Sequence, residues 1–173
     1  MEPDGAGSGL MPLMQILYDS SIAVAVRESE TLFPWIESAH VLMIAVVFGT
    51  IAMVDLRLMG VSAHRRGARQ LIVDMLPFTW IAFVFAVASG GLLFLSNATG
   101  YYESMPFRFK LLAILIAGIN MAVFHLTAYR KIDEWDDLLP TPKAARIAGL
   151  TSLTLWVIII FLGRWIGYSA PLA

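Results

Sequence analysis

The stretch ESAHVLMIAVVFGTIAMVDLR, residues 37–57, is apolar almost throughout, yet it has ionisable side chains at both ends. Glu37 and His40 lie near its start, and Asp55 and Arg57 lie near its end. The hydrocarbon core of a bilayer requires about 20 mostly apolar residues per helix, and this stretch is long enough. It therefore predicts a membrane-spanning helix with polar groups near each face of the bilayer.

Three further stretches of the chain have a similar length and character. Together with the first, they predict helices at about residues 33–59, 71–96, 107–129 and 145–165. Of the 173 residues, 58% are hydrophobic and 14% are charged, whereas roughly a quarter of the residues in soluble domains are charged. The mean hydropathy of +0.74 agrees with this difference. We therefore expect an all-α fold, a four-helix transmembrane bundle in the lipid bilayer.

The charge and the residue types exclude several kinds of site. A net charge of -1 gives no field that would attract nucleic acid, so we expect no nucleic-acid partner. The chain has no cysteine, which excludes disulfides, thiolate metal ligands and a cysteine nucleophile. Any chemistry must therefore use histidine, carboxylates or a cofactor.

Residues 1–31 form an N-terminal region that we expect to be retained, because its acidic, glycine-rich start lacks the positive charge of a secretion signal. Apolar residues recur there at helical spacing, but Asp19 and Arg27 interrupt them before a span is complete. Ser20 or Ser21 would be a suitable N-cap. We expect a tail and a pair of short interfacial helices, followed by the four-helix domain over residues 32–173.

Basic residues gather on one side of the predicted spans. Eight of the twelve Lys and Arg lie in or beside the two loops that share a side, namely Arg57, Arg65, Arg66, Arg69, Arg130, Lys131, Lys143 and Arg146. Loops rich in Lys and Arg stay in the cytoplasm. We therefore expect both termini to lie outside the cytoplasm.

Glu37, His40 and Asp55 share one face of the first helix. His40 lies three residues after Glu37, about one turn, and Asp55 lies eighteen residues after it, about five turns. Ionisable groups inside a span face other helices or water, so this face should turn inward. For Asp55 and Arg57 the favoured interpretation is an anchoring role at the cytoplasmic end. For Glu37 and His40, two interpretations are equally supported. The two side chains could hydrogen-bond to each other near the interface, or they could form a ligand or proton-handling site.

The third predicted span adds Lys110 near the outside, Asn120 in the middle and His125 near the cytoplasm. Asn120 is most simply a hydrogen-bonding contact between helices. His125 could donate to a carbonyl, but histidine is also the usual ligand of haem b and of transition metals. By helix rise, His40 lies about 10 Å and His125 about 24 Å below the outer surface, so they suit one iron poorly.

Near the outer surface, Lys110 and Arg164 could gather around Glu37 and His40. They could form an aromatic and basic belt at the headgroups. The alternative, which the sequence supports less, is a polar pocket for an anion, a quinone oxygen or a haem propionate. The candidate metal ligands are His40, Glu37 and His125.

The chain resembles an uncharacterised family of small bacterial inner-membrane proteins with four spans. The resemblance rests on PWIESAHVLMIAVVFGTIAMVDLRLMG, GINMAVFH and GRWIGY, and thus on Pro34, Glu37, His40, Asp55, Leu56, Arg57, Asn120, Phe124, His125, Gly163, Arg164 and Trp165. It implies an inner-membrane location and the four-span topology, but no activity. More distantly, the chain is similar to copper-resistance membrane domains and four-helix b-type cytochromes, although it has three histidines where two bis-histidine haems need four.

Three functions are open at this point, and none of them decides whether the protein is an enzyme. The first, slightly favoured, is a redox- or metal-associated subunit with a single b-type haem. The second is an oligomeric transporter or proton-handling protein lined by Glu37, His40 and Asp55. The third is a non-catalytic anchoring subunit with a periplasmic or membrane protein partner, and a homo-oligomer is a further possibility.

Overall fold

The described part of the chain is built of helices. The computed structural model describes residues 9–61, 67–136 and 141–169. What the sequence predicted for residues 1–8 and 170–173, and for Arg65 and Arg66, lies outside these ranges. Within them the chain forms helices and no strand, so the predicted all-α class is confirmed.

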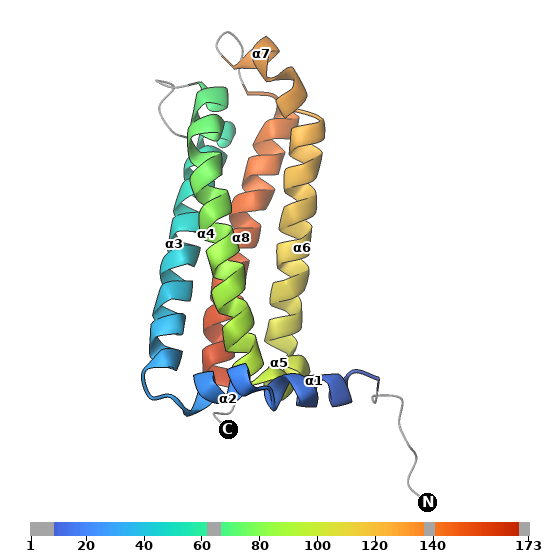
Figure 1. Cartoon of the computed structure of the whole chain (residues 1–173). Coiled ribbons are helices and arrows are strands. Elements are labelled where there is room, and N and C mark those ends of the chain that lie inside the picture. The colour runs from blue at the N-terminus through green and yellow to red at the C-terminus, as the bar shows by residue number, and fades with distance from the viewer. Residues whose placement is uncertain (1–8, 62–66, 137–140, 170–173) are drawn as a thin grey trace, which may run out of the picture.

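Four long helices cross the bundle in alternating directions along the chain (Figure 1). They are α3 (Leu32–Met59), α4 (Ala68–Ser96), α6 (Met105–Leu126) and α8 (Lys143–Ser169). Each contains a stretch long and apolar enough to cross a bilayer, with a mean hydropathy of 2.0 or 2.1. The protein is therefore a multi-pass membrane protein, and the predicted four-helix bundle is confirmed.

The four helices do not pack evenly around the bundle. Helix α3 packs against α4 and α8, and α8 packs against α6. The backbones of α4 and α6 lie farther apart in their described parts, and Phe94 of α4 stacks on Phe107 of α6 near α5, with 5.4 Å between the ring centres. The contact between α3 and α8 is close because Gly149 of α8 has no side chain. A Cβ atom there would lie 3.0 Å from the Asp55 carbonyl oxygen and 3.2 Å from the Leu58 Cβ. The bundle is thus tight at α3 and α8 and spread between α4 and α6.

Short helices cross one end of the bundle, which we call the α5 end. They are α1 (Met11–Tyr18), α2 (Ser21–Glu28) and α5 (Ala98–Glu103). Helices α1 and α2 run across the ends of the long helices (Figure 1). Asp19 lies between the first two, as its interruption of the apolar pattern predicted. The N-cap of α2 is Ser20, whose hydroxyl accepts from the amide of Ala23 (3.3 Å).

Arg27 holds α1 and α2 on the bundle. Its guanidinium donates to the carbonyls of Tyr18 (3.2 Å) and Ser96 (3.4 Å), and it lies 4.0 Å from the centre of the Tyr18 ring. Ser96 ends α4, and the carbonyls at a helix C-terminus favour a cation. The short helices are therefore fixed to the end of α4 by a specific contact.

At the opposite end, which we call the α7 end, the structure differs from the sequence prediction. The third helix was predicted to run to residue 129, but α6 ends at Leu126. There the Thr127 hydroxyl donates to the carbonyl of Val123 (2.6 Å), and the Thr127 backbone leaves helical geometry. The chain then turns through η1 (Tyr129–Lys131) into α7 (Ile132–Trp135), neither of which was predicted.

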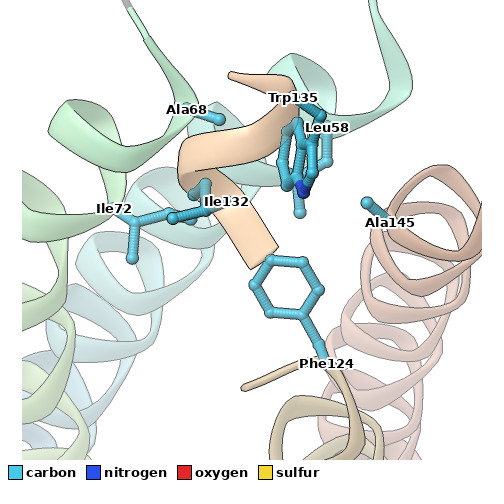
Figure 2. Close-up of a cluster of buried hydrophobic side chains, with 7 residues drawn as sticks. All are labelled: Leu58, Ala68, Ile72, Phe124, Ile132, Trp135 and Ala145. Carbon is cyan, nitrogen blue, oxygen red and sulfur yellow. The ribbon is translucent and has the colours of Figure 1, made fainter. Parts of the chain in front are cut away.

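Helix α7 closes this end of the bundle with two apolar side chains. Figure 2 shows Ile132 and Trp135 pointing into the space between the long helices. The Trp135 indole donates to the Ala128 carbonyl (3.2 Å). The whole buried cluster consists of Leu58, Ala68, Ile72, Phe124, Ile132, Trp135 and Ala145. Because it draws residues from α3, α4, α6, α7 and α8, it joins all the long helices.

Asp136, directly after α7, fastens this cluster in place. Its carboxylate accepts hydrogen bonds from the backbone amides of Ala68 and Arg69, the latter at 3.1 Å, and so satisfies the first turn of α4. It also forms an ion pair with Arg57 (3.7 Å), in which both side chains are nearly buried. A neighbouring pair, Arg69 with Asp133, is exposed.

Candidate functional site

A cavity of about 200 Å³ lies among the four long helices, in the half of the bundle nearer α7. Its walls are mostly apolar and aromatic, with Trp80 and Phe83 from α4 and Trp156 from α8 among them. The polar side chains in its lining are Asp55, Thr79, Asn120, His125 and Ser152. Leu58, Ile72 and Phe124 belong both to the cavity wall and to the buried cluster, so that cluster closes the cavity at the α7 end.

Asp55 is the distinctive group in this cavity. Its side chain is only 5% exposed, and its Oδ2 atom has no hydrogen-bond partner in the described part of the protein. The Ser152 hydroxyl is the side-chain group that bonds to this carboxyl. Burying a carboxylate oxygen without a partner costs several kcal/mol by typical values. The folded bundle therefore holds an unsatisfied acceptor at the wall of an apolar cavity.

The other polar side chains of the cavity already have partners. The His125 ring donates from Nδ1 to the Met121 carbonyl (2.9 Å), and this leaves Nε2 as an acceptor when the ring is neutral. The Asn120 amide donates to the Ala148 carbonyl of α8 (3.0 Å), which is the interhelical contact that the sequence suggested. Asp55 thus differs from its neighbours in the cavity.

Exposed lining residues on α4 and α6 indicate that the cavity opens sideways, between these two helices. Trp80 of α4 is 47% exposed and Met121 of α6 is 38% exposed. Gly118 of α6 also lines the cavity and is exposed, and an added Cβ there would meet nothing within 4 Å. Because the flanks of a membrane bundle face acyl chains, this opening faces the bilayer. A molecule dissolved in the membrane could reach the cavity without crossing water.

A second polar group lies toward the α5 end of the bundle, and we call it the His40 cluster (His40, Ser89 and Lys110). Ser89 donates to the Phe85 carbonyl (2.7 Å), so His40 Nδ1 is the donor in its contact with Ser89 Oγ (3.0 Å). A Cβ at Gly90 would lie 2.8 Å from His40 Cε1. The imidazole therefore fills the space that a glycine leaves.

Lys110 approaches this cluster from α6. Its Nζ lies 3.4 Å from where a Cβ at Gly163 would be, and its charge acts on the His40 ring. The structure thus brings together two of the four residues that were predicted to gather near the outer surface, and packs each against a glycine.

The other two residues of that prediction lie elsewhere. Glu37 is exposed, and its negative charge acts on Tyr101 of α5. Burial, and then the negative charge of Glu37, raise the pKa of that phenol. Arg164 is also exposed. It donates to the Tyr168 hydroxyl (3.4 Å) and stacks over the same ring at 5.1 Å.

The predicted ligands for haem or metal are spread along the bundle. His40 lies 15 residues before Asp55 on α3, and that spacing corresponds to about 22 Å along a helix. His125 lines the cavity beside Asp55, whereas His40 does not. Among the residues that the structure describes, no three His, Asp or Glu side chains come close enough to hold a metal ion. A single haem bridged by the two histidines therefore does not fit this arrangement.

Sequence reasoning treated Asp55 as an anchor and missed the cavity. The available signal was Asp55 on the inward face of a span, with Gly149 and Ser152 on another helix. One sequence does not reveal that these groups meet.

Comparison with known proteins gives a family and no activity. Residues 31–169 match the model of a family of unknown function, DUF6644. No curated protein and no solved structure gives a significant match.

Proposed function

The chain belongs to the DUF6644 family, and we propose that it binds a small, membrane-dissolved molecule in the cavity at Asp55. The observation that carries this proposal is the buried Oδ2 atom of Asp55, which has no partner within the described residues and lies in the wall of an apolar cavity. A ligand that offers a hydrogen bond to this oxygen would remove the cost of burying it.

The surroundings of Asp55 favour a ligand over bulk water. The α7 end is closed by the cluster around Trp135, and the open side faces the bilayer. An apolar cavity with a few polar groups is the usual form of a small-molecule site. The aromatic wall supplies the apolar contacts, and Asp55 supplies the orienting one.

The test uses tryptophan fluorescence, because Trp156 lies in the cavity wall. The protein is placed in nanodiscs of zwitterionic lipid and titrated with 4-bromobenzyl alcohol, whose bromine quenches nearby indoles. We expect a saturable phase on top of linear quenching from the bilayer. The saturable phase should be lost when both tryptophans of the cavity wall, Trp80 and Trp156, are replaced by Phe. It should be kept in Trp165→Phe, because Trp165 is exposed on the bundle surface.

Two glycine variants control for access to the cavity. Gly118→Leu should fill the opening and abolish the saturable phase. Gly91→Leu should keep it, because Gly91 has equally open surroundings but does not line the cavity. Equal behaviour of the two variants, or quenching without saturation, would overturn the proposed function.

A redox- or metal-associated role with His125 as the ligand is the second candidate. One observation favours it: the bond from His125 Nδ1 to a carbonyl leaves Nε2 as the acceptor, the arrangement that ligating histidines commonly have. A reduced-minus-oxidised absorption spectrum, with elemental analysis of the purified protein, decides this role. The absence of both a haem band and a stoichiometric metal would remove it.

A transport role lined by Glu37, His40 and Asp55 has less support. The inward face of α3 carries Val47 between His40 and Asp55, and this side chain is buried. Such a path would therefore need a rearranged or oligomeric bundle. A second copy or a membrane partner seated between α4 and α6 would compete with the ligand proposed here.

The proposed location is the bacterial inner membrane, with both termini outside the cytoplasm. Helix alternation puts the basic residues of α3, α4, η1 and α8 at the α7 end, and places α1 and the last turn of α8 at the other (Figure 1). Alkaline phosphatase fused after Ala173 should be active in cells. A fluorescent protein that matures only in the cytoplasm should stay dark there, and its fluorescence would reverse the orientation.

A further inference from the structure

The described lining of the Asp55 cavity contains an acidic side chain and no Lys or Arg. Among its described lining residues, the ionisable side chains are Asp55 and His125. The nearest basic group on α3 is Arg57, which is ion-paired with Asp136 at the α7 end. The cavity therefore has a buried carboxyl without a cation in its wall to balance it.

The donors nearest to this carboxyl are also in use. Ser152 bonds to Asp55, the His125 Nδ1 proton goes to Met121, and the Thr79 hydroxyl lies 2.8 Å from Thr50 and 3.0 Å from the Met75 carbonyl. The Asp55 Oδ2 atom still lacks a donor. A ligand that fits this site must therefore bring one.

The aromatic walls favour a cation over a neutral donor. Trp80, Phe83 and Trp156 all line the cavity. The face of an aromatic ring attracts a cation, and this attraction strengthens when water is excluded. A carboxylate and several aromatic rings in one cavity are together suited to a ligand that carries an ammonium group on an apolar skeleton.

We infer that the ligand is a lipophilic primary or secondary amine, bound as its ammonium ion with the nitrogen at Asp55 Oδ2 and the apolar part among the aromatic side chains. This inference rests on the proposed function, because it names the ligand class of the same cavity. A neutral alcohol or a hydrocarbon of the same shape would share the apolar contacts and lack the ionic one.

The experiment compares 4-bromobenzylamine with 4-bromobenzyl alcohol, which differ only in the polar group. Both are titrated into the protein in nanodiscs of zwitterionic lipid, and the saturable quenching is read as the part lost when Trp80 and Trp156 are both replaced by Phe. We expect the amine to bind at least about tenfold more tightly than the alcohol, as a desolvated charge pair allows. In Asp55→Asn this preference should fall to within about twofold.

The outcomes separate the two proposals. Saturable binding of both probes with equal affinity would overturn the amine inference and leave the proposed function standing. Saturable binding of neither probe would overturn both. An amine preference that survives in Asp55→Asn would also overturn the inference, because the charge would then be recognised elsewhere. Retained alcohol binding in Asp55→Asn shows that the variant is folded.

Discussion

The His40 cluster and the Asp55 cavity are two polar regions of the same four-helix bundle, and they differ in how their space is filled. At the His40 cluster, the imidazole is bonded to Ser89 and lies against Gly90, and Lys110 lies against Gly163. At the Asp55 cavity, Gly149 brings the α8 backbone against α3, but Asp55 lines a cavity of about 200 Å³. One region is packed, and the other has room for a ligand.

The difference comes from the neighbouring helices rather than from the polar residues themselves. Glycine opposite a polar side chain lets the backbone close around it, as Gly90 does for His40. At Asp55 the side chain is buried, but its Oδ2 atom has no partner among the described residues, and the helices around it leave a cavity. A polar residue inside a span therefore marks a binding site when the packing around it is incomplete, whatever its own chemistry.

The largest expected effect concerns what keeps the cavity closed at the α7 end. Asp136→Ala removes the cap of α4 and one partner of Arg57. Breaking a nearly buried ion pair costs about 3–5 kcal/mol, so the free energy of unfolding should fall by about that amount in detergent. Asp133→Ala is the matched control, because its exposed pair with Arg69 contributes at most about 1 kcal/mol. Equal losses would show that α7 is not held by Asp136.

The packing of the His40 cluster is tested by two adjacent glycines. Gly90→Ala places a Cβ against the imidazole and should lower the free energy of unfolding by about 1–3 kcal/mol, because it overpacks a filled space. Gly91→Ala has open surroundings and should be neutral or slightly stabilising, since alanine favours a helix. Thermal unfolding of both variants is the measurement. A tolerated Gly90→Ala would mean that the His40 cluster has spare room.

Asp55→Asn tests whether the unpartnered carboxyl group of the cavity destabilises the folded protein. The unpartnered carboxylate oxygen should destabilise the empty protein, so its replacement by an amide should raise the free energy of unfolding by on the order of 1 kcal/mol. Such a gain in stability with a loss of the preference for the amine is typical of functional sites. Denaturant unfolding without ligand measures it. A clear loss of stability would show that Asp55 has a structural partner.

The smallest effect is expected at Asn120, which lines the same cavity but already donates to Ala148. Asn120→Ala should lower the free energy of unfolding by only about 0.6 kcal/mol, an average value for a polar contact between membrane helices. The ratio of amine to alcohol affinity should stay unchanged in the quenching assay. A lost ratio would give Asn120 a share of the recognition assigned to Asp55.

Much of the fold follows from the sequence, because a membrane span leaves a long apolar run and a short interfacial helix does not. The four long helices and the break at Asp19 were predicted from these patterns alone. Helix α7 was not, because its apolar contribution is only Ile132 and Trp135 among charged neighbours. Its place depends on Asp136 reaching α4, a contact between residues 67 and 68 positions apart in the chain.

The site was harder to predict than the fold. The predicted inward face of α3 holds for His40 and Asp55, but it is wrong for Glu37, which is exposed. Spacing along one helix also does not show which helices separate. The sequence analysis placed a candidate pocket near the outer surface instead, because Lys110 and Arg164 lie at the depth of Glu37 and His40. The spread between α4 and α6 depends on the summed packing of whole helices, so a list of polar residues cannot reveal it.

The central claim is that the Asp55 cavity, and not the His40 cluster, holds the ligand. Its most direct measurement is anomalous diffraction at the bromine absorption edge from crystals of the full chain grown with 4-bromobenzylamine. We expect a bromine peak among Trp80, Phe83 and Trp156, with the ammonium nitrogen within hydrogen-bonding distance of Asp55 Oδ2. A peak beside His40 and Lys110, or peaks confined to the lipid-facing surface with the cavity empty, would contradict the claim.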